Sequence, residues 1–350
     1  MTAPQHIRHA TTRDGVDIAY YAIGRGEPVV CLPWGITSHV SHEWHYREQR
    51  HWLKRLATKR RVIRLDHRGT GLSDRRATFT VEGGAHDIDA VVRHEGLQRF
   101  ALLGQVHSAA AAISYASQFP QRISHLVLWC GFANYREFVE SSPPLQAARA
   151  AADKDWHTFT ELIAQQATGW ADLSHARRFA AYLRECATAE HFLRCIDHFE
   201  NVDLTPNLVA LTMPVLVLQP REAAFPTIEV AKRLSAATPG ARLMLLEGAT
   251  LLPFLGDVET IATTVDQFLA DTEVRTRPGG LTEREVEILE RLAGGFSNQG
   301  IARELAISIR TVERHVGNVY LKIGAHNRAQ ATAYAIRKGL VSGVDTRSIS

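Results

Sequence analysis

The sequence predicts an α/β domain, built on a mostly parallel sheet with a helical lid, followed by a small all-α domain. Three observations indicate this fold class. β-rich runs alternate with helical stretches up to about residue 130, a long helical region without strand signals follows, and every pattern after residue 280 is helical. The segment 271–280 is polar and ends in Pro-Gly-Gly, which breaks a helix. We therefore expect a first domain over 1–270, a linker over 271–280 and a second domain over 281–350.

The composition excludes several classes of protein. Of the 350 residues, 45% are hydrophobic and 22% are charged, so the chain can bury a large core, and the net charge of +3 indicates no partner by itself. The four cysteines show no C-x-x-C spacing, which favours buried free thiols in a reducing compartment over disulfides. The N-terminus has no apolar signal region, and no run approaches the roughly 18 apolar residues of a membrane span. We expect a cytoplasmic protein that requires neither a membrane nor a cofactor.

Short β-rich runs supply the sheet of the first domain. They read VDIAYYAI at 16–23, PVVCLP at 28–33, RVIRLD at 61–66, FALLGQV at 100–106 and HLVLWC at 125–130. Helical stretches such as 44–57 and 108–119 lie between them, which predicts right-handed βαβ units. Strand signals stop over about 132–205 and return at 214–219 and 241–248, before an amphipathic helix at 258–270. The helical insertion predicts a lid over the carboxyl edge of the strands, where ligands bind in such sheets.

Short helices joined by tight turns make up the second domain. The first starts at Thr282, which forms a capping box with Glu285, and the second has Ser297 as its N-cap. After a turn at 306–308, the third helix carries β-branched apolar residues at helical spacing, which form a core stripe. A separate stripe of the same helix is polar and basic. Two short helices around a tight turn, with such a face on the second, predict a helix-turn-helix whose second helix reads DNA.

The polar stripe supplies the candidate DNA-binding residues. Between residues 303 and 338, seven Lys or Arg residues stand against two Glu residues. Such side chains can hold phosphates and offer forked donors to guanine edges. A solvated face in a small helical bundle is the alternative interpretation. The residues that we expect to contact DNA are Arg310, Thr311, Arg314, His315, Asn318 and Lys322.

The second domain resembles the LuxR-type helix-turn-helix domain of bacterial transcriptional regulators. The resemblance covers about sixty residues, 281–340, and is carried by LTEREVEIL, GFSNQGIARELAISIRTVERHVGNVYLKIG and RAQATAYAIRKGL. One departure is Gly300, where the family usually has Glu. The change removes a second capping box, and Gly costs a helix about 1 kcal/mol relative to Ala, so we expect weaker binding or a greater dependence on dimerisation. The resemblance implies a homodimer on double-stranded DNA, with an inverted-repeat operator and dimerisation through the last helix.

Three segments of the first domain resemble the α/β-hydrolase superfamily and the hydrolase-like domains that are fused to regulatory modules. They are RLDHRGTGLSD at 64–74, LLGQVHSAAAA at 102–112 and LLEGATLLPFL at 245–255. The second segment has the shape of a nucleophile elbow, a sharp strand-to-helix turn that presents the catalytic serine. The resemblance covers roughly residues 8–270 and implies a triad of nucleophile, acid and base at the matched positions.

The three triad positions hold residues that cannot perform this chemistry. Val106 stands at the nucleophile position, Ala223 at the acid position and Leu251 at the base position. A triad needs a nucleophile, a base within hydrogen-bond reach and a carboxylate that orients the base. Pro33 and Trp34 also replace the usual entry to the oxyanion hole. We therefore predict no catalytic residue and no enzymatic activity.

The elbow raises two further questions, on Ser108 and on backbone strain. Ser108 lies two residues beyond the tip of the elbow, and its hydroxyl is expected to bond a backbone carbonyl one turn back. The residue at the tip normally has a positive φ, which is an outlier for a β-branched valine. Either the turn has relaxed, or the surrounding packing holds Val106 in strain.

Apolar side chains in place of the triad predict a pocket for a small, largely hydrophobic effector. Lid aromatics such as Trp156, Phe159 and Trp170 fit either this pocket or the core of the lid. The residues that we expect to line the pocket are Trp34, Val106, His107, Trp129 and Leu251.

Three histidines spaced three apart precede the first long helix. A metal site is one interpretation of His39, His42 and His45, but no carboxylate or cysteine pattern completes it. We expect no metal, and instead a pocket entrance whose histidines give hydrogen bonds or pH sensitivity.

The two domains together predict a ligand-responsive, DNA-binding transcriptional regulator whose hydrolase-like domain binds its effector without turning it over. One alternative is a bifunctional regulator that hydrolyses an ester or a lactone through Ser108 or a lid residue. Another is a hydrolase-like domain that serves only for dimerisation, with its pocket closed by side chains. Turnover that is lost in a Ser108→Ala variant would favour the first alternative. Absence of ligand-induced stabilisation would favour the second.

Overall fold

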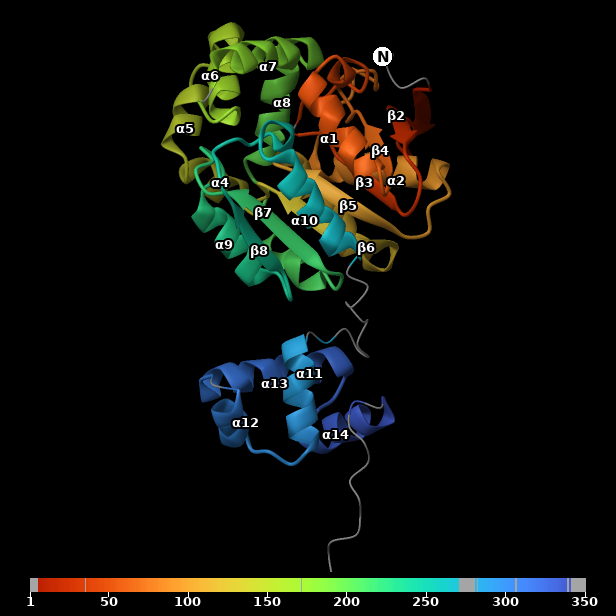
Figure 1. Ribbon diagram of the computed structural model, residues 1–350, viewed down its shortest axis with the longest axis vertical. Coiled ribbons are helices and arrows are strands. Elements are labelled where there is room, and N and C mark those ends of the chain that lie inside the picture. The colour runs from red at the N-terminus through yellow and green to blue at the C-terminus, as the bar shows by residue number, and fades with distance from the viewer. Residues whose placement is uncertain are drawn as a thin grey trace, which may run out of the picture. The chain divides into compact units, whose positions relative to one another are not determined.

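The computed structural model describes residues 6–34, 36–170, 172–270, 281, 283–305, 307–338 and 340, with the side chains of all but Glu283 and Arg314. The chain divides into two compact units, Met1–Asp271 and Thr272–Ser350 (Figure 1). The first is an α/β unit with a mostly parallel sheet and the second is all-α, so the predicted fold class is confirmed. The predicted linker at 271–280 and the predicted cap Thr282 lie outside the described residues.

A sheet forms the centre of the first unit. Its strands are β1 (Arg8–Thr11), β2 (Asp17–Ile23), β3 (Pro28–Cys31), β4 (Arg61–Leu65), β5 (Phe100–Gln105), β6 (Ile123–Trp129), β7 (Val215–Pro220) and β8 (Arg242–Leu246). In the described part of the chain they form an 8-stranded sheet in the order β1-β2-β4-β3-β5-β6-β7-β8. β2 pairs antiparallel with β1 and β4, and every pair from β4 to β8 is parallel. β5 and β7 are buried along their whole length, as expected for parallel strands that are covered on both faces.

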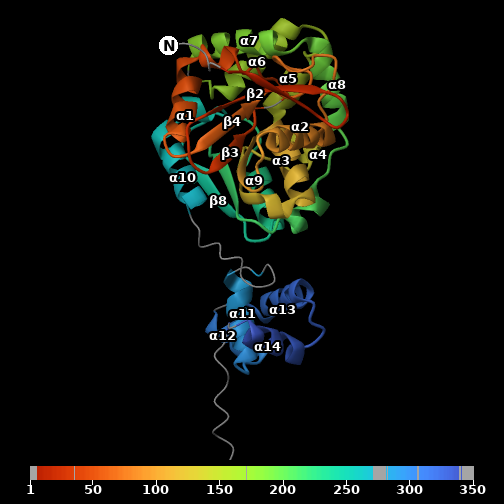
Figure 2. The same ribbon diagram turned by 90° about the vertical axis from the view of Figure 1, so that its right-hand side faces the viewer.

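Helices cover both faces of this sheet. They are α1 (Arg47–Ala57), α2 (Val81–His94), α3 (His107–Gln118), α9 (Ile228–Ala237) and α10 (Val258–Ala270). Figure 2 shows α1 and α10 against one face and α2, α3 and α9 against the other. Short 3₁₀ helices lie at His42–Trp44, Pro120–Arg122, Thr205–Ala210 and Pro253–Leu255. Glycine and alanine let α3 approach β5 closely, since a Cβ on Gly104 would lie 2.8 Å from Ala109 Cα.

The lid is the helical insertion between β6 and β7, at the top of Figure 1. Its helices are α4 (Tyr135–Glu140), α5 (Pro143–Arg149), α6 (Trp156–Ala167), α7 (Leu173–Cys186) and α8 (Ala189–Phe199). Each begins after a residue whose side chain accepts a backbone N–H of the first turn, which explains why short helices form here in succession. These N-caps are Asn134, Ser142, Asp155, Asp172 and Thr188.

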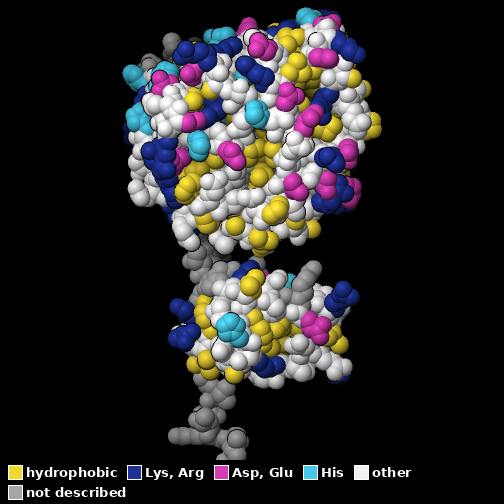
Figure 3. Space-filling view, turned by 180° about the vertical axis from the view of Figure 1, so that it is seen from behind, with side chains coloured by type: hydrophobic (Ala, Val, Ile, Leu, Met, Phe, Trp, Pro, Cys, Tyr) yellow, Lys and Arg dark blue, Asp and Glu magenta, His cyan; other side chains and the backbone are white. Residues whose placement is uncertain are grey.

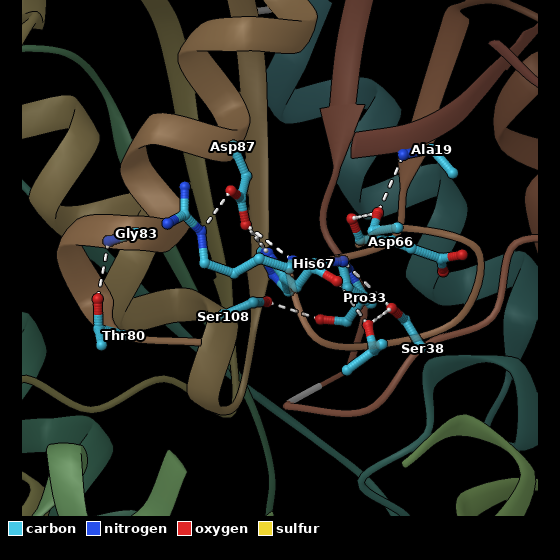
Figure 4. A network of polar contacts seen from close by, with 12 residues as sticks. Ala19, Pro33, Ser38, Asp66, His67, Thr80, Gly83, Asp87 and Ser108 are labelled. Atoms are coloured by element: carbon cyan, nitrogen blue, oxygen red, sulfur yellow. Dashed lines mark hydrogen bonds and ion pairs between the residues drawn. The ribbon is translucent and has the colours of Figure 1, made fainter. Parts of the chain in front are cut away.

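The turn at 66–74, after β4, is a buried polar junction (Figure 4). Asp66 accepts the backbone N–H groups of Val40 and Leu72, both at 2.9 Å. Arg68 Nε donates to Asp87 Oδ1 at 2.8 Å and so connects the turn to α2. Burial raises the pKa of the Asp66 carboxyl to about 7. One carboxyl group therefore joins this turn to the loop that contains the predicted histidine entrance.

Two predictions from composition can be compared with the structure. The cysteines Cys31, Cys130, Cys186 and Cys195 are buried and free, as predicted. Burial raises the pKa of each of these thiols, that of Cys195 to about 12. Within the described ranges, no helix combines the length and the apolar character that crossing a membrane requires.

The second unit consists of short helices packed on one another. They are α11 (Glu283–Ala293), α12 (Asn298–Glu304), α13 (Ile309–Ile323) and α14 (Arg328–Arg337). Ser297 Oγ accepts the N–H of Gly300, and Ser308 Oγ accepts the N–H of Thr311, both at 3.1 Å. Both helices of the helix-turn-helix therefore begin at a serine N-cap. The predicted core stripe on α13 is buried or partly buried, at Val312, Val316, Val319 and Ile323.

Candidate functional site

The elbow between β5 and α3 is present, with a valine at its tip. Val106 has φ 50° and ψ −112°, so its backbone is in a region that a β-branched residue rarely adopts. Its N–H donates to the Trp129 carbonyl at 2.9 Å, and its own carbonyl accepts the N–H of Ala109 at 3.1 Å. The side chain is fully buried. The turn has therefore not relaxed, and packing holds Val106 in strain.

The Ser108 hydroxyl is bound to the backbone around the elbow. Its Oγ lies 2.7 Å from the carbonyl oxygen of Pro33 and 2.9 Å from that of Gln105 (Figure 4). It also accepts the N–H of Gln105 at 2.9 Å. The Ser108 side chain is completely buried. Its contact with the Gln105 carbonyl is the bond expected one turn back. This serine joins β5 and the loop after β3 to α3.

Leu251 and Ala223 are the residues predicted at the other two triad positions. Leu251 is fully buried, and its N–H donates to the Ala167 carbonyl at 2.8 Å. Its own carbonyl accepts the indole N–H of Trp129 at 2.7 Å. Ala223 lies half-buried in the turn after β7. Apolar side chains thus stand at the tip of the elbow and at both predicted partner positions.

A cavity lies between the elbow and the lid; we call it the lid cavity. It contains about 520 Å³ of empty space, its open mouth included. Every lid helix contributes to its wall, and almost all the side chains that line it are aliphatic or aromatic. They include Phe138, Leu145, Phe159, Phe192, Ile196 and Phe225. This cavity is suited to an apolar ligand or part of one.

A second cavity, which we call the polar cavity, adjoins the end of β5 and contains about 450 Å³ of empty space, its open mouth included. Its polar lining residues are Thr37, Glu43, Tyr46, Gln49, Arg64, Gln105 and Tyr182. Arg64 Nη2 lies 2.5 Å from Glu43 Oε2, and both side chains are buried. The Glu43 carboxylate raises the pKa of the Arg64 guanidinium against the opposing effect of burial, so Arg64 is positively charged. Trp34 and Thr37 line both cavities.

His107, the first residue of α3, lies at the wall of the lid cavity. Its ring centroid is 5.2 Å from that of Phe199 and 5.5 Å from that of Phe138. Nε2 is buried and has no hydrogen-bond partner among the described residues. Burial, and to a smaller extent the charge of Arg149, lower the pKa of His107 to about 3. The imidazole is therefore neutral at physiological pH.

The predicted pocket residues divide into two groups. Trp34 lines both cavities and His107 lines the lid cavity. The other three, Val106, Trp129 and Leu251, are buried but line neither cavity. They are hydrogen-bonded to one another: Val106 N–H donates to the Trp129 carbonyl, and the Trp129 indole donates to the Leu251 carbonyl. Most residues that line the lid cavity come from the lid helices instead. Trp156 and Phe159 line the lid cavity, whereas Trp170 is 58% exposed.

The predicted histidine entrance contains a stacked pair. The rings of His39 and His42 are 3.7 Å apart, and His42 Nδ1 lies 2.7 Å from Glu185 Oε2 on α7. Burial and the neighbouring His42 lower the pKa of His39 to about 4. His45 is exposed. Among the described residues, no group of three or more His, Cys, Asp or Glu side chains could hold a metal ion.

The candidate nucleic-acid interface is the polar stripe of α13. Arg310 and Asn318 are exposed, and Thr311 and His315 are partly buried. Lys322 Nζ instead forms an ion pair with the buried Glu285 carboxylate at 2.6 Å, which ties α13 to α11. The side chain of Arg314 lies outside the described part of the structure. On the face of the first unit in Figure 3, Lys and Arg side chains are interspersed with Asp and Glu.

Comparisons with known families support the division into two parts. The family model "alpha/beta hydrolase fold" matches residues 28–229, and the model "Bacterial regulatory proteins, luxR family" matches residues 280–335. "Response regulator protein VraR" of Staphylococcus aureus (strain Mu3 / ATCC 700698) is 48% identical over 61 residues. The match includes 17% of this chain, and the chain spans about 29% of the length of the curated relatives it matches.

Solved structures similar to the first unit include two esterases. An esterase RhEst1 from Rhodococcus sp. ECU1013 superposes with a TM-score of 0.66 at 22% identity, over 76% of this chain and 98% of its own. The esterase EaEST from Exiguobacterium antarcticum gives a TM-score of 0.64 at 18% identity, over 77% of this chain and 99% of its own. At such identities the likeness shows the fold alone.

Proposed function

We propose that the protein is a transcription regulator controlled by a small molecule. The premise is that the chain belongs to the α/β-hydrolase fold family and carries a LuxR-type helix-turn-helix domain at residues 280–335. The first unit binds the molecule without turning it over, and the second unit binds double-stranded DNA. The observation that carries this proposal is a catalytic frame with a buried valine at the tip of its elbow, beside an intact apolar cavity.

The absence of turnover is inferred from the groups around the elbow. Acyl transfer needs a nucleophile with a base in hydrogen-bond reach. Val106 has no nucleophilic atom, Leu251 has no basic atom, and Ser108 is buried against two backbone carbonyls. Filling of the cavity, without reaction, is then the signal that the first unit can give.

We assign DNA binding to the polar stripe of α13. We propose that Arg310, Thr311, Arg314, His315 and Asn318 contact the duplex, some at phosphates and some at base edges. Lys322 is removed from this set, because its ammonium group is engaged by Glu285 inside the second unit. A homodimer on an inverted repeat remains part of the proposal.

Coupling between the units follows from differential binding. A ligand changes DNA affinity only if it binds one arrangement of the dimer better than another. Because every lid helix contributes to the wall of the lid cavity, the lid is the part of the first unit that responds most directly to a ligand.

The test is a screen of activated short-chain esters and other small apolar compounds with the purified full-length protein. We expect a compound that raises Tm and changes the affinity for duplex DNA over the same concentration range, and that is recovered intact. Ile163→Trp places a larger side chain in the lid cavity and is expected to remove both responses but not DNA binding. Product release that disappears in Ser108→Ala would establish a hydrolase and overturn the proposal. Absence of DNA binding by the wild type would do the same.

A further inference from the structure

The two cavities meet at Trp34 and Thr37 but differ in chemistry, and this difference defines a class of ligand. We infer that the ligand is an uncharged amphiphile. Its apolar chain or ring system occupies the lid cavity, and its head group, which carries a carbonyl oxygen and an N–H or O–H donor, passes Trp34 and Thr37 into the polar cavity. This inference rests on the proposed function of the first unit as a small-molecule site.

Unpaired polar atoms mark the place of the head group. Trp34 Nε1, Thr37 Oγ1 and Gln49 Oε1 are buried and have no hydrogen-bond partner among the described residues. All three residues line the polar cavity. Native proteins pair nearly all buried polar atoms, so these three indicate what a ligand supplies. The indole N–H donates to a carbonyl oxygen, the Gln49 oxygen accepts from an N–H or O–H, and the Thr37 hydroxyl does either.

The charges in the polar cavity exclude an ionised head group. Glu43 already accepts from Arg64 Nη2 and from the Tyr21 hydroxyl, both at 2.5 Å. The remaining Arg64 nitrogens donate to Glu43 at 3.2 Å and to the Cys31 carbonyl at 2.9 Å. A carboxylate beside this pair would lie near Glu43 without a cation of its own, and burial of an unpaired charge is very costly.

The charge that lines the lid cavity is already paired, so the cavity suits the apolar part of the ligand. Its cationic lining residue, Arg149, lies 3.3 Å from the Glu200 carboxylate and stacks over the Tyr135 ring at 5.6 Å. His107 is uncharged in its aromatic surroundings.

The test compares probes of equal chain length that differ in head group. Octanamide carries the inferred head group, octanoate carries a charge at neutral pH, and octane has no head group. Their dissociation constants for the full-length protein are measured by calorimetry. We expect octanamide to bind at least about tenfold more tightly than octanoate or octane, which corresponds to a gain of the size of one or two buried hydrogen bonds.

A pair of tryptophan variants tests the place of the head group. Trp34→Phe keeps an aromatic ring but removes the N–H, and is expected to abolish most of the preference for octanamide. Trp52→Phe is the matched control, because Trp52 Nε1 is also buried without a partner among the described residues, yet Trp52 lines neither cavity. The control is expected to keep the full preference. Circular dichroism of both variants verifies that they are folded.

Either of two results overturns the inference: octanoate or octane that binds as tightly as octanamide, or a preference that survives in Trp34→Phe. The inference and the proposed function fail separately. If octanamide is preferred as expected but leaves DNA affinity unchanged, the ligand class stands and the regulator does not. If another compound from the screen changes DNA affinity while octanoate equals octanamide, the regulator stands and the ligand class does not.

Discussion

Helices α3 and α13 both begin directly after a tight turn, but the chain forms these two turns by different means. At α13, Ser308 has an ordinary extended backbone, with φ −68° and ψ 149°, and caps the helix with its hydroxyl. At α3, Val106 has φ 50° and provides no side-chain cap. Local sequence is sufficient to form the turn before α13, whereas packing between β5 and α3 imposes the turn before α3. Packing between β5 and α3 therefore holds the elbow, with a valine at its tip.

The largest expected effect comes from blocking the close approach that imposes the elbow. In Gly104→Val, the new Cβ would lie 2.8 Å from Ala109 Cα and 2.8 Å from Ala112 Cβ. We expect the free energy of unfolding of the first unit to fall by about 3 kcal/mol, as measured by chemical denaturation.

The matched glycine lies in α13. A Cβ on Gly317 would have no neighbour within 4 Å, so Gly317→Ala is expected to stabilise the second unit by about 1 kcal/mol. If Gly104→Val lowered the free energy of unfolding by less than about 1 kcal/mol, the elbow would not depend on packing. The contrast between the two turns would then be lost.

His107 provides an intermediate effect, which depends on pH. Its pKa in the folded protein is about 3, far below the usual 6.5, so only the unfolded chain takes up this proton as the pH falls from 6.5 towards 3. The contribution to stability is complete above pH 6.5 and is lost progressively below it. A His107→Phe variant lacks this loss. Its unfolding free energy is expected to decline less steeply than that of the wild type, by about 1.4 kcal/mol per pH unit between pH 6 and 4.

Urea titrations of both proteins at several pH values measure this difference. His39 and Asp66 also have shifted pKa values, but they are present in both proteins and cancel in the comparison. Parallel stability curves would contradict a neutral, desolvated His107 at the start of α3.

The smallest expected effect is at the capped turn. Ser308→Ala removes the acceptor of the Thr311 N–H and is expected to destabilise the second unit by about 1 kcal/mol, as measured by thermal unfolding. Ser297→Ala at the start of α12 is the control and is expected to behave alike. No change in either variant would show that packing, rather than capping, fixes these helix starts.

Sequence reasoning succeeded where local signals determine structure. The serine cap at Ser297 and the valine stripe of α13 are local features, and the structure contains both. The elbow was also recognisable, but the sequence left open whether Val106 is strained, because φ at Val106 depends on the packing of β5 against α3. The Lys322–Glu285 ion pair joins residues 37 apart, so helical periodicity alone grouped Lys322 with the residues that we expect to contact DNA.

The pocket was the least predictable part. The pocket was expected to include Val106, Trp129 and Leu251, because they lie at or near the predicted triad positions. Hydrogen bonds join these three residues to one another, and they line neither cavity. Phe138, Ile196 and Phe225 line the lid cavity and were not singled out. Aromatic and aliphatic residues at helical spacing look the same whether they face a cavity or the core of a lid. Of the predicted pocket residues, Trp34 and His107 line a cavity, and each has a buried ring nitrogen without a hydrogen-bond partner among the described residues.

The distribution of cysteines has a practical consequence. All four lie in the first unit, are buried, and have thiols whose pKa is raised by burial. Alkylating reagents react with the thiolate. In the folded first unit, burial blocks their access to the sulfur atoms, and the raised pKa keeps the thiols protonated. The second unit contributes no thiol, because positions 272–350 contain no cysteine. Mass spectrometry of alkylated protein therefore reports openings of the first unit alone, in the presence of DNA or of any candidate ligand.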